Sequence, residues 1–412
     1  MKKLLILGAL ALTPVFASTT DTVAEERNYY QYQELILGKA LKSNFMGIMK
    51  QDQSLYVDAL EDVLEEMPNN VQALNSLESV NSFFYELADQ FRVDLLKIKY
   101  NVLADFAPEL IESMRAELSS AEPQRKLLYL LAANESLVLK KGHGDIIELA
   151  KMHKAYYDIE TRSGEDEETV EPAEVYTDLF YATPDVTTYM NGEYVKSVKI
   201  FKFCRTNRLF PCLMVMKDIH DQPVRNANGE LWVNPSLASS SRGLPSYSRN
   251  GNTPAGIFTI DSVMPVADQQ ISYGKNRRMI LNFVPAAQNE SLLKSLLPPS
   301  SQDKVWWKES AVARDIGRNL FRIHGTGKVN NDPNTPYFPF MRTSGCIAQR
   351  ENTYAGTVYR DQRNLLDTIM KAMELEPKYE NEIKIKGIVY LIELNEKNEP
   401  VSRADLLALG IN

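Results

Sequence analysis

Cysteine and histidine are both scarce in this chain. Its 412 residues include three cysteines and four histidines. No combination of these residues has the short spacing that structural zinc sites use. We therefore expect neither a metal ion nor another cofactor, and the few cysteines and histidines that are present become informative.

A positive charge balance is also missing. The formal net charge is −8, whereas nucleic-acid-binding proteins normally carry a basic stripe that neutralises phosphates. The charge therefore argues against nucleic acid as a partner, although it leaves room for a local cationic pocket. Hydrophobic residues make up 44% and charged residues 24% of the chain, which is typical of a globular protein. The length is sufficient for more than one core.

Long apolar runs are absent beyond the N-terminus, so we expect no stable membrane span in the mature protein. The chain begins "MKKLLILGALALTPVFASTT". Lys2 and Lys3 precede a short apolar run, and Val15 and Ala17 are the small residues of a cleavage site. Residues 1–17 are thus predicted to be a signal peptide, with an uncleaved anchor as the alternative. We expect an exported protein of the bacterial periplasm or cell envelope.

Helical periodicity dominates the first part of the remaining chain. In "SFFYELADQFRVDLLKIKYNVLADF", apolar residues recur in steps of three and four, which is typical of an amphipathic helix. These residues are Phe84, Leu87, Phe91, Leu95, Ile98 and Val102. We predict an all-α helical domain over residues 18–160, which positions the protein or binds an envelope-protein partner. The acidic segment that follows, poor in apolar residues, predicts a linker over residues 161–190.

After the linker, the period changes to two and β-forming residues dominate. The candidate strands are "SVKIFKF", "CLMVMKD", "AGIFTIDSVMPV", "RMILNFV", "NLFRIHG" and "KGIVYLIEL". The segment 361–375 is predicted to be a helix that packs against them. The expected fold is therefore α+β and multidomain: the helical domain, then a mainly-β domain over residues 191–395 and a C-terminal tail over residues 396–412.

Cys346 lies in the turn sequence "TSGCIAQR", and His324 ends the apolar strand "LFRIHGT". A neighbouring imidazole promotes the thiolate, which is the reactive form of cysteine. Backbone N–H groups at the Gly345 turn are oriented donors for an oxyanion. We expect a helix to begin just after Cys346, and we expect the site to open onto a surface cleft.

The alternative is that Cys346 is an inert buried thiol and His324 a surface residue. Cys204 and Cys212 sit at matching points of a predicted hairpin, so they are the more probable disulfide pair in an exported protein. That pairing leaves Cys346 as the odd cysteine. An odd cysteine beside a glycine favours a reactive thiol.

Two motifs resemble a known family. "HGT", a loop and then "TSGC" resemble the signature of the YkuD-type L,D-transpeptidases, and "GNTPAGIFTI" resembles the segment that precedes it. The resemblance covers roughly residues 195–395. It implies Cys346 as the nucleophile and His324 as the general base. It also implies an oxyanion hole formed by the N–H groups of Gly345 and Cys346.

The remaining matches concern the substrate. Gly325 and Thr326 match the residues after the base, and Ser344 stands where the commonest signature has a second histidine. Ala348 replaces a polar residue, so Arg342 or Arg350 is the candidate contact for a substrate carboxylate. The loop 325–345 is longer than usual and rich in aromatics such as Tyr337. These aromatics either form a wall for the peptide stem or pack the loop onto the domain.

The chemistry that the resemblance implies is acyl transfer through a thioester. The thiolate attacks a tetrapeptide stem of peptidoglycan, and the terminal D-amino acid leaves. An amine acceptor gives a 3–3 cross-link or an exchanged D-amino acid, whereas water gives an L,D-carboxypeptidase. A hypothesis of another class is a non-catalytic envelope protein that binds peptidoglycan, motivated by Ser344 and Ala348.

Overall fold

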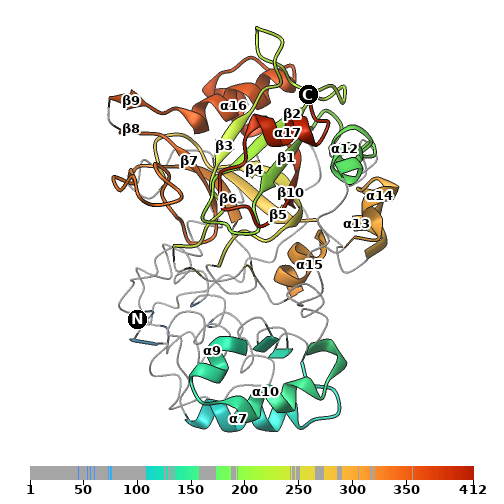
Figure 1. The fold of residues 1–412 in the computed structure, drawn as a ribbon, viewed down its shortest axis with the longest axis vertical. Helices are drawn as coiled ribbons and strands as arrows, with labels where there is room; N and C mark the ends of the chain where they lie inside the picture. The colour runs from blue at the N-terminus through green and yellow to red at the C-terminus, as the bar shows by residue number, and fades with distance from the viewer. Residues whose placement is uncertain are drawn as a thin grey trace, which may run out of the picture.

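A computed structural model of the chain gives the fold (Figure 1). It describes residues 108–124, 127–128, 131–132, 135–156, 173–186, 194–241, 251–264, 273–284, 290–304, 306–315, 321–354 and 356–412, with a few isolated positions. The predicted signal peptide, most of the predicted helical domain and the first part of the predicted linker lie outside the described residues. In the described part of the chain, no helix has the length and apolar character needed to cross a bilayer.

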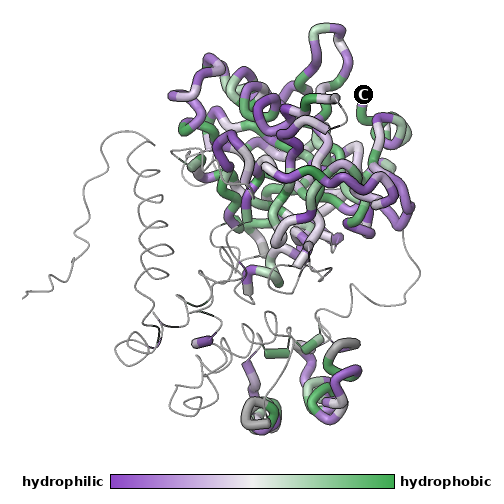
Figure 2. The backbone as a smooth tube through the Cα atoms, turned by 90° about the vertical axis from the view of Figure 1, so that its left-hand side faces the viewer, coloured by the Kyte–Doolittle hydropathy of each residue, from purple (hydrophilic) through white to green (hydrophobic). Residues whose placement is uncertain are grey.

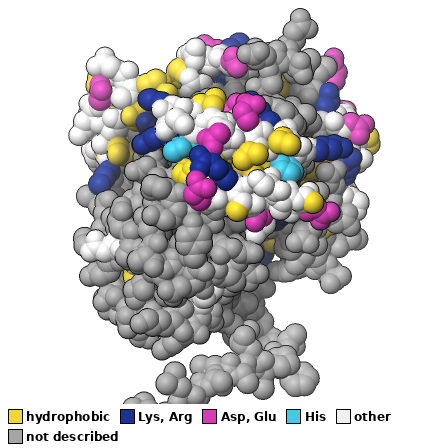
Figure 3. Space-filling model, turned by 90° about the horizontal axis from the view of Figure 1, so that it is seen from below, with side chains coloured by type: hydrophobic (Ala, Val, Ile, Leu, Met, Phe, Trp, Pro, Cys, Tyr) yellow, Lys and Arg dark blue, Asp and Glu magenta, His cyan; other side chains and the backbone are white. Residues whose placement is uncertain are grey.

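Three short helices and one 3-10 turn form the described part of the predicted helical domain. They are α7 (Pro108–Leu118), α9 (Glu135–Lys140), α10 (Gly144–Lys151) and η4 (Lys154–Tyr156). Their apolar side chains share one cluster, which includes Met114, Val138 and Ile147. On the face shown in Figure 3, basic and acidic side chains of the described residues are interspersed. On these helices, Arg115 pairs with Asp145 at 2.6 Å.

An eight-stranded mixed sheet forms the second part. Its strands are β1 (Val198–Cys204), β2 (Cys212–Lys217), β3 (Asn234–Ser236), β4 (Gly256–Val263), β5 (Met279–Phe283), β6 (Phe321–Thr326), β7 (Ile347–Arg350) and β10 (Gly387–Glu393). They are arranged in the order β3-β2-β1-β10-β4-β5-β6-β7. Alternating apolar residues form these strands because one side chain in two reaches each core. All six strands predicted from the sequence are confirmed.

The sheet nearly closes on itself, since its two edge strands meet. Beyond β3, the N–H of Leu237 donates to the carbonyl of Ala348 at 3.0 Å, and the N–H of Ala348 donates to the carbonyl of Leu237 at 2.8 Å. The enclosed core includes Phe258, Ile323 and Ile347. Helix α16 (Asp361–Ala372) inserts its apolar face into the same core, which confirms the helix predicted near residues 361–375.

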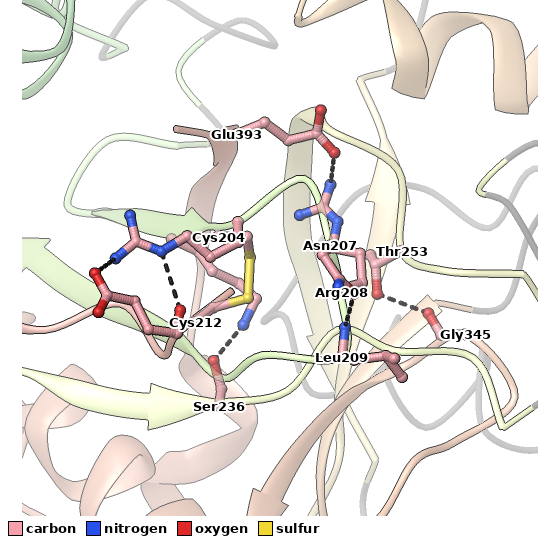
Figure 4. The surroundings of a disulfide bond; sticks show 12 residues. Cys204, Asn207, Arg208, Leu209, Cys212, Ser236, Thr253, Gly345 and Glu393 are labelled. Atoms are coloured by element: carbon pink, nitrogen blue, oxygen red, sulfur yellow. Dashed lines mark hydrogen bonds and ion pairs between the residues drawn. A yellow bond between two sulfur atoms is a disulfide. The ribbon is translucent and has the colours of Figure 1, made fainter. Parts of the chain in front are cut away.

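A disulfide joins the ends of the β1–β2 hairpin, as the matching positions of its two cysteines predicted. Cys204 and Cys212 are bonded (Figure 4), and their Cα atoms are 4.3 Å apart. Cys346 is not part of a disulfide and keeps its thiol. The hairpin therefore accounts for two cysteines, and Cys346 is the cysteine outside the disulfide.

Two boundaries differ from the sequence expectation. Helix α12 (Ala173–Tyr181) lies in the predicted linker, yet Tyr176 and Leu179 pack into the core on the outer face of the sheet. Helix α17 (Arg403–Ala408) lies in the predicted tail, yet Leu406 packs into the same core. Both segments are therefore integral parts of the β domain, because the outer face of the sheet needs their apolar side chains as a cover.

The outer face is completed by α13 (Glu290–Ser295), α14 (Pro299–Gln302) and α15 (Lys308–Asp315). Trp307 is fully buried there and donates its indole N–H to the carbonyl of Ser301 at 3.1 Å. Figure 2 shows that hydrophobic segments are gathered inside the sheet domain, with hydrophilic residues prominent in its projecting loops. A small hairpin of β8 (Thr353–Tyr354) and β9 (Thr357–Val358) and the 3-10 helix η6 (Tyr379–Lys384) complete the described elements.

Candidate functional site

The register of β6 and β7 brings the two predicted catalytic residues together. These strands are parallel, with Ile323 opposite Ile347 and His324 opposite Ala348. Ile323 and Ile347 point into the enclosed core, so His324 and Ala348 point to the other face. Cys346 directly precedes β7, two residues before Ala348, in the bend that leads into the strand. Ala348 is opposite His324 and two residues after Cys346, so His324 and Cys346 are neighbours across the β6–β7 pair.

The ring of His324 is held in one tautomer. Its Nδ1 lies 2.6 Å from the carbonyl oxygen of Gly325. A carbonyl oxygen only accepts hydrogen bonds, so Nδ1 carries the proton and Nε2 is the basic nitrogen. The ring of Tyr273 meets the imidazole edge to face, with centroids 5.1 Å apart. His324 lies inside β6, which continues to Thr326, and not at the end of the strand as predicted.

The turn before Cys346 depends on glycine. Gly345 has φ +104°, a conformation that residues with a side chain rarely adopt. The carbonyl of Gly345 accepts a hydrogen bond from Oγ1 of Thr253 at 2.8 Å (Figure 4). The carbonyl of Cys346 accepts one from Oγ1 of Thr343 at 2.7 Å. The peptide units on both sides of the nucleophile candidate are thus fixed by hydroxyl groups.

The segment after Cys346 is strand β7, so the expectation of a helix there is wrong. Ile347–Arg350 pairs with β6 on one side, and Ala348 bonds Leu237 on the other. Before the turn, the N–H of Ser241 donates to the carbonyl of Thr343 at 2.6 Å. The Cys346 turn is therefore clamped between β6 and the segment 237–241. This pairing satisfies its backbone groups in extended form, which removes the need for a helix.

The site is more closed than the predicted surface cleft. Cys346 is 8% exposed and His324 is 1% exposed. Phe340, from the loop that connects them, is buried against Leu237 and Ala348, and Tyr337 packs on the same cluster. Of the two interpretations of the loop aromatics, the packing interpretation therefore describes these two residues in this structure.

Both predicted carboxylate contacts have partners within the chain. Nε of Arg350 lies 2.5 Å from Oδ2 of Asp361, and its guanidinium stacks on Phe340 and Tyr359. Burial raises the pKa of Asp361, and the ion pair with Arg350 opposes that rise. Nε of Arg342 donates to the carbonyl of Ser240 at 2.7 Å. The two arginines thus bind groups of the chain itself around the site, Asp361 and the Ser240 carbonyl.

The other predicted substrate contacts lie close to the reactive pair. Oγ1 of Thr326 is buried and donates to the carbonyls of Lys328 and Gln349, at 3.2 and 3.3 Å. Ser344 is half-buried and directly precedes the Gly345 turn. Gly325 supplies the carbonyl that orients the imidazole of His324. Thr326 and Gly325 therefore support the site from within the chain, and Ser344 stands at its edge.

Sequence reasoning missed two arginines near His324. Arg322 lies two residues before His324 on the same face of β6, and it is 2% exposed. Arg278 directly precedes β5, and its guanidinium covers the ring of Tyr273 at 4.1 Å. The alternation in "FRIHG" contained the signal for Arg322, because polar residues at 322 and 324 share one face of an apolar strand. Arg278 had no such signal, since its place depends on the β5–β6 register.

A buried carboxylate was also missed. Glu351 accepts a hydrogen bond from the N–H of Lys275 at 2.5 Å and another from the side chain of Asn276. Burial raises the pKa of Glu351, and these hydrogen bonds oppose that rise. Its carboxyl group occupies the space that a side chain at Gly325 or Gly274 would need. Glu351 thus ties the segment that carries Tyr273 to the strand that carries His324.

The arrangement is that of a thiol in the turn before β7 and an oriented imidazole on the adjoining strand β6. In the part of the chain that the structure describes, no group of three His, Cys, Asp or Glu side chains could hold a metal ion. Comparison of the chain with protein-family models, with curated proteins and with solved structures found no match.

Proposed function

We propose that this protein is a cysteine L,D-transpeptidase that acts on the tetrapeptide stems of peptidoglycan. The observation that supports the proposal is the β6–β7 register, which pairs His324 with Ala348 and so sets His324 beside the turn that carries Cys346. The motif resemblance supplies the substrate class. The proposal includes export to the periplasm and the formation of 3–3 cross-links or exchange of the terminal D-amino acid.

The proposed reaction has two halves. Nε2 of His324 takes the proton of the Cys346 thiol, and Sγ attacks the carbonyl at the L-centre of the diaminopimelate residue. The N–H groups of the Gly345 turn stabilise the oxyanion. The C–N bond to D-alanine then breaks, His324 returns the proton to the leaving amine, and a thioester remains. The nitrogen of an amine acceptor then attacks the thioester carbonyl, the C–S bond breaks, and the proton that the amine loses passes through His324 to Sγ of Cys346.

Purified muropeptides test the proposal. Wild-type protein should convert tetrapeptide stems into 3–3 dimers or exchanged stems, and Cys346→Ala should not. Tripeptides without dimers or exchanged stems would indicate the alternative L,D-carboxypeptidase, in which water is the acceptor. Unchanged muropeptides would contradict both activities.

The closed site favours a second candidate function, a non-catalytic envelope protein that binds peptidoglycan. His324 is 1% exposed, which is low for a base that must reach a substrate. A carbapenem distinguishes the two candidates, because a reactive Cys346 opens the β-lactam ring and gains its mass. An adduct on wild type but not on Cys346→Ala supports the enzyme. Retention on peptidoglycan sacculi without any adduct supports the binding protein.

A further inference from the structure

We propose that Thr253 is a positioning residue that fixes the orientation of the oxyanion-binding N–H of Cys346. The inference deepens the proposed function and rests on Cys346 as its nucleophile. It begins with the geometry of a single peptide unit. The carbonyl of Gly345 and the N–H of Cys346 belong to the same planar trans unit and point in opposite directions. A group that fixes the carbonyl therefore also fixes the N–H.

Thr253 is that group. Its side chain is fully buried, and Oγ1 donates to the carbonyl of Gly345 at 2.8 Å (Figure 4). Thr253 lies three residues before β4, in the segment that leads into this strand. Its own N–H donates to the carbonyl of Ala238 at 3.3 Å, so its backbone is anchored to the segment that also clamps Cys346.

Glycine makes this restraint necessary. Gly345 has φ +104°, and glycine populates both halves of φ space at little cost. The peptide plane after such a residue rotates easily unless a hydrogen bond selects one orientation. The hydroxyl of Thr253 selects it before the substrate arrives, which is the condition for effective oxyanion stabilisation. A hydrogen bond on the carbonyl also polarises the amide, and so strengthens the N–H as a donor.

The position also explains why two distant motifs occur together. Thr253 begins "TPAGIFTI", and Gly345 belongs to "TSGC". The hydrogen bond from Thr253 to Gly345 is a direct contact between these segments. The first motif is thus part of the support for the reactive turn, in addition to forming β4.

The test compares two reactions of the same thiol. Acylation of Cys346 by p-nitrophenyl acetate passes through an oxyanion: Sγ adds to the ester carbonyl, p-nitrophenolate leaves, and a thioester forms. Alkylation by iodoacetamide displaces iodide at a saturated carbon and forms no oxyanion. A loss of orientation at the Cys346 N–H therefore slows the first reaction and spares the second.

Thr253→Val keeps the shape of the side chain and removes the donor. We expect its acylation rate to fall about ten- to a hundredfold, less than the 10²–10³ typical for complete removal of an oxyanion donor. Its alkylation rate should stay within about twofold of wild type, and Thr253→Ser should restore acylation. Thr259→Val is the matched control. Thr259 lies in β4, is buried as Thr253 is, and also donates its hydroxyl to a carbonyl, that of Asn282. If Thr253→Val does not fold, Thr253→Ala takes its place with the same expectation.

Three outcomes would overturn the inference. They are equal losses of acylation and alkylation in Thr253→Val, a loss no larger than that of Thr259→Val, and no acylation of wild-type Cys346 by the ester. The result is separable from that of the proposed function. If wild type leaves muropeptides unchanged but ester acylation depends on Thr253, the substrate proposal fails and the inference stands. If muropeptides are processed equally by wild type and Thr253→Val, the inference fails and the proposed function stands.

Discussion

Two single residues of the sheet domain have unexpected surroundings. The first is Lys202, a lysine in the core. It is fully buried inside the sheet and donates to the hydroxyl of Ser236. Burial holds the pKa of Lys202 well below its ordinary value, and the nearby Arg208 lowers it further. An amine whose pKa falls on folding destabilises the native state at pH values below the ordinary lysine pKa, because the folded chain binds the proton less tightly than the unfolded chain does.

Replacing this amine should therefore stabilise the protein. We expect Lys202→Met to raise the free energy of unfolding by on the order of 1 kcal/mol at pH 7. The gain should shrink as the pH rises toward about 10.4, the ordinary lysine value, because the unfolded chain then also loses the proton. Urea unfolding at several pH values measures both effects. Lys199→Met is the control: Lys199 pairs with Asp221 at 2.9 Å, so its loss should destabilise. A Lys202→Met variant that is less stable at every pH would contradict this account.

Gly325 is the second such residue. A methyl group at this position would overlap the carboxylate of Glu351. We expect Gly325→Ala to lower the free energy of unfolding by about 1–3 kcal/mol, the range for overpacking. The same change in a Glu351→Ala background should cost less, because the colliding group is gone. Denaturant unfolding of both single variants and the double variant completes the cycle. Additive losses would show that Gly325 and Glu351 do not interact.

At the scale of elements, the sequence predicted the secondary structure of a segment where interactions within that segment determine it. Strands β1, β2 and β10 were predictable because short runs rich in apolar, β-forming residues record burial within each segment. Strand β7 was not, since its extended form depends on Leu237, which is distant in the sequence. Likewise, the candidate residues Cys346 and His324 could be named from motifs, whereas Arg278 and Glu351 reach the site only through the tertiary fold.

Helix α17 gives the element-scale prediction. Its Asp405 pairs with the fully buried Arg205 at 2.9 Å, and Leu406 and Ile411 lie in the outer core. Removal of residues 396–412 should therefore expose apolar surface and leave a buried guanidinium without this carboxylate. We expect the truncated protein to be insoluble or to unfold at a much lower temperature, as thermal unfolding would show. A truncated protein as stable as the full chain would support the original interpretation of this segment as a tail.

At the scale of the whole molecule, a nearly closed sheet brings both edge strands to the reactive turn. Strand β6 supplies His324, the segment after β3 clamps the turn, and the segment before β4 binds Gly345. Elements of one sheet thus position each group, which is the condition that the proposed acyl transfer would need. The sheet also accounts for the low exposure of the site, because Phe340 and Tyr337 close over the same face.

The most direct test of the central claim is detection of the acyl-enzyme itself. The protein is incubated with a tetrapeptide stem, quenched in acid, digested and mapped by mass spectrometry. We predict a tripeptide thioester on Cys346 in wild type, formed at least about a hundredfold more slowly in His324→Gln, in line with the loss of a general base. A wild-type protein that carries no acyl group on Cys346 while the stem remains intact, or one that is acylated equally fast without His324, would contradict the account.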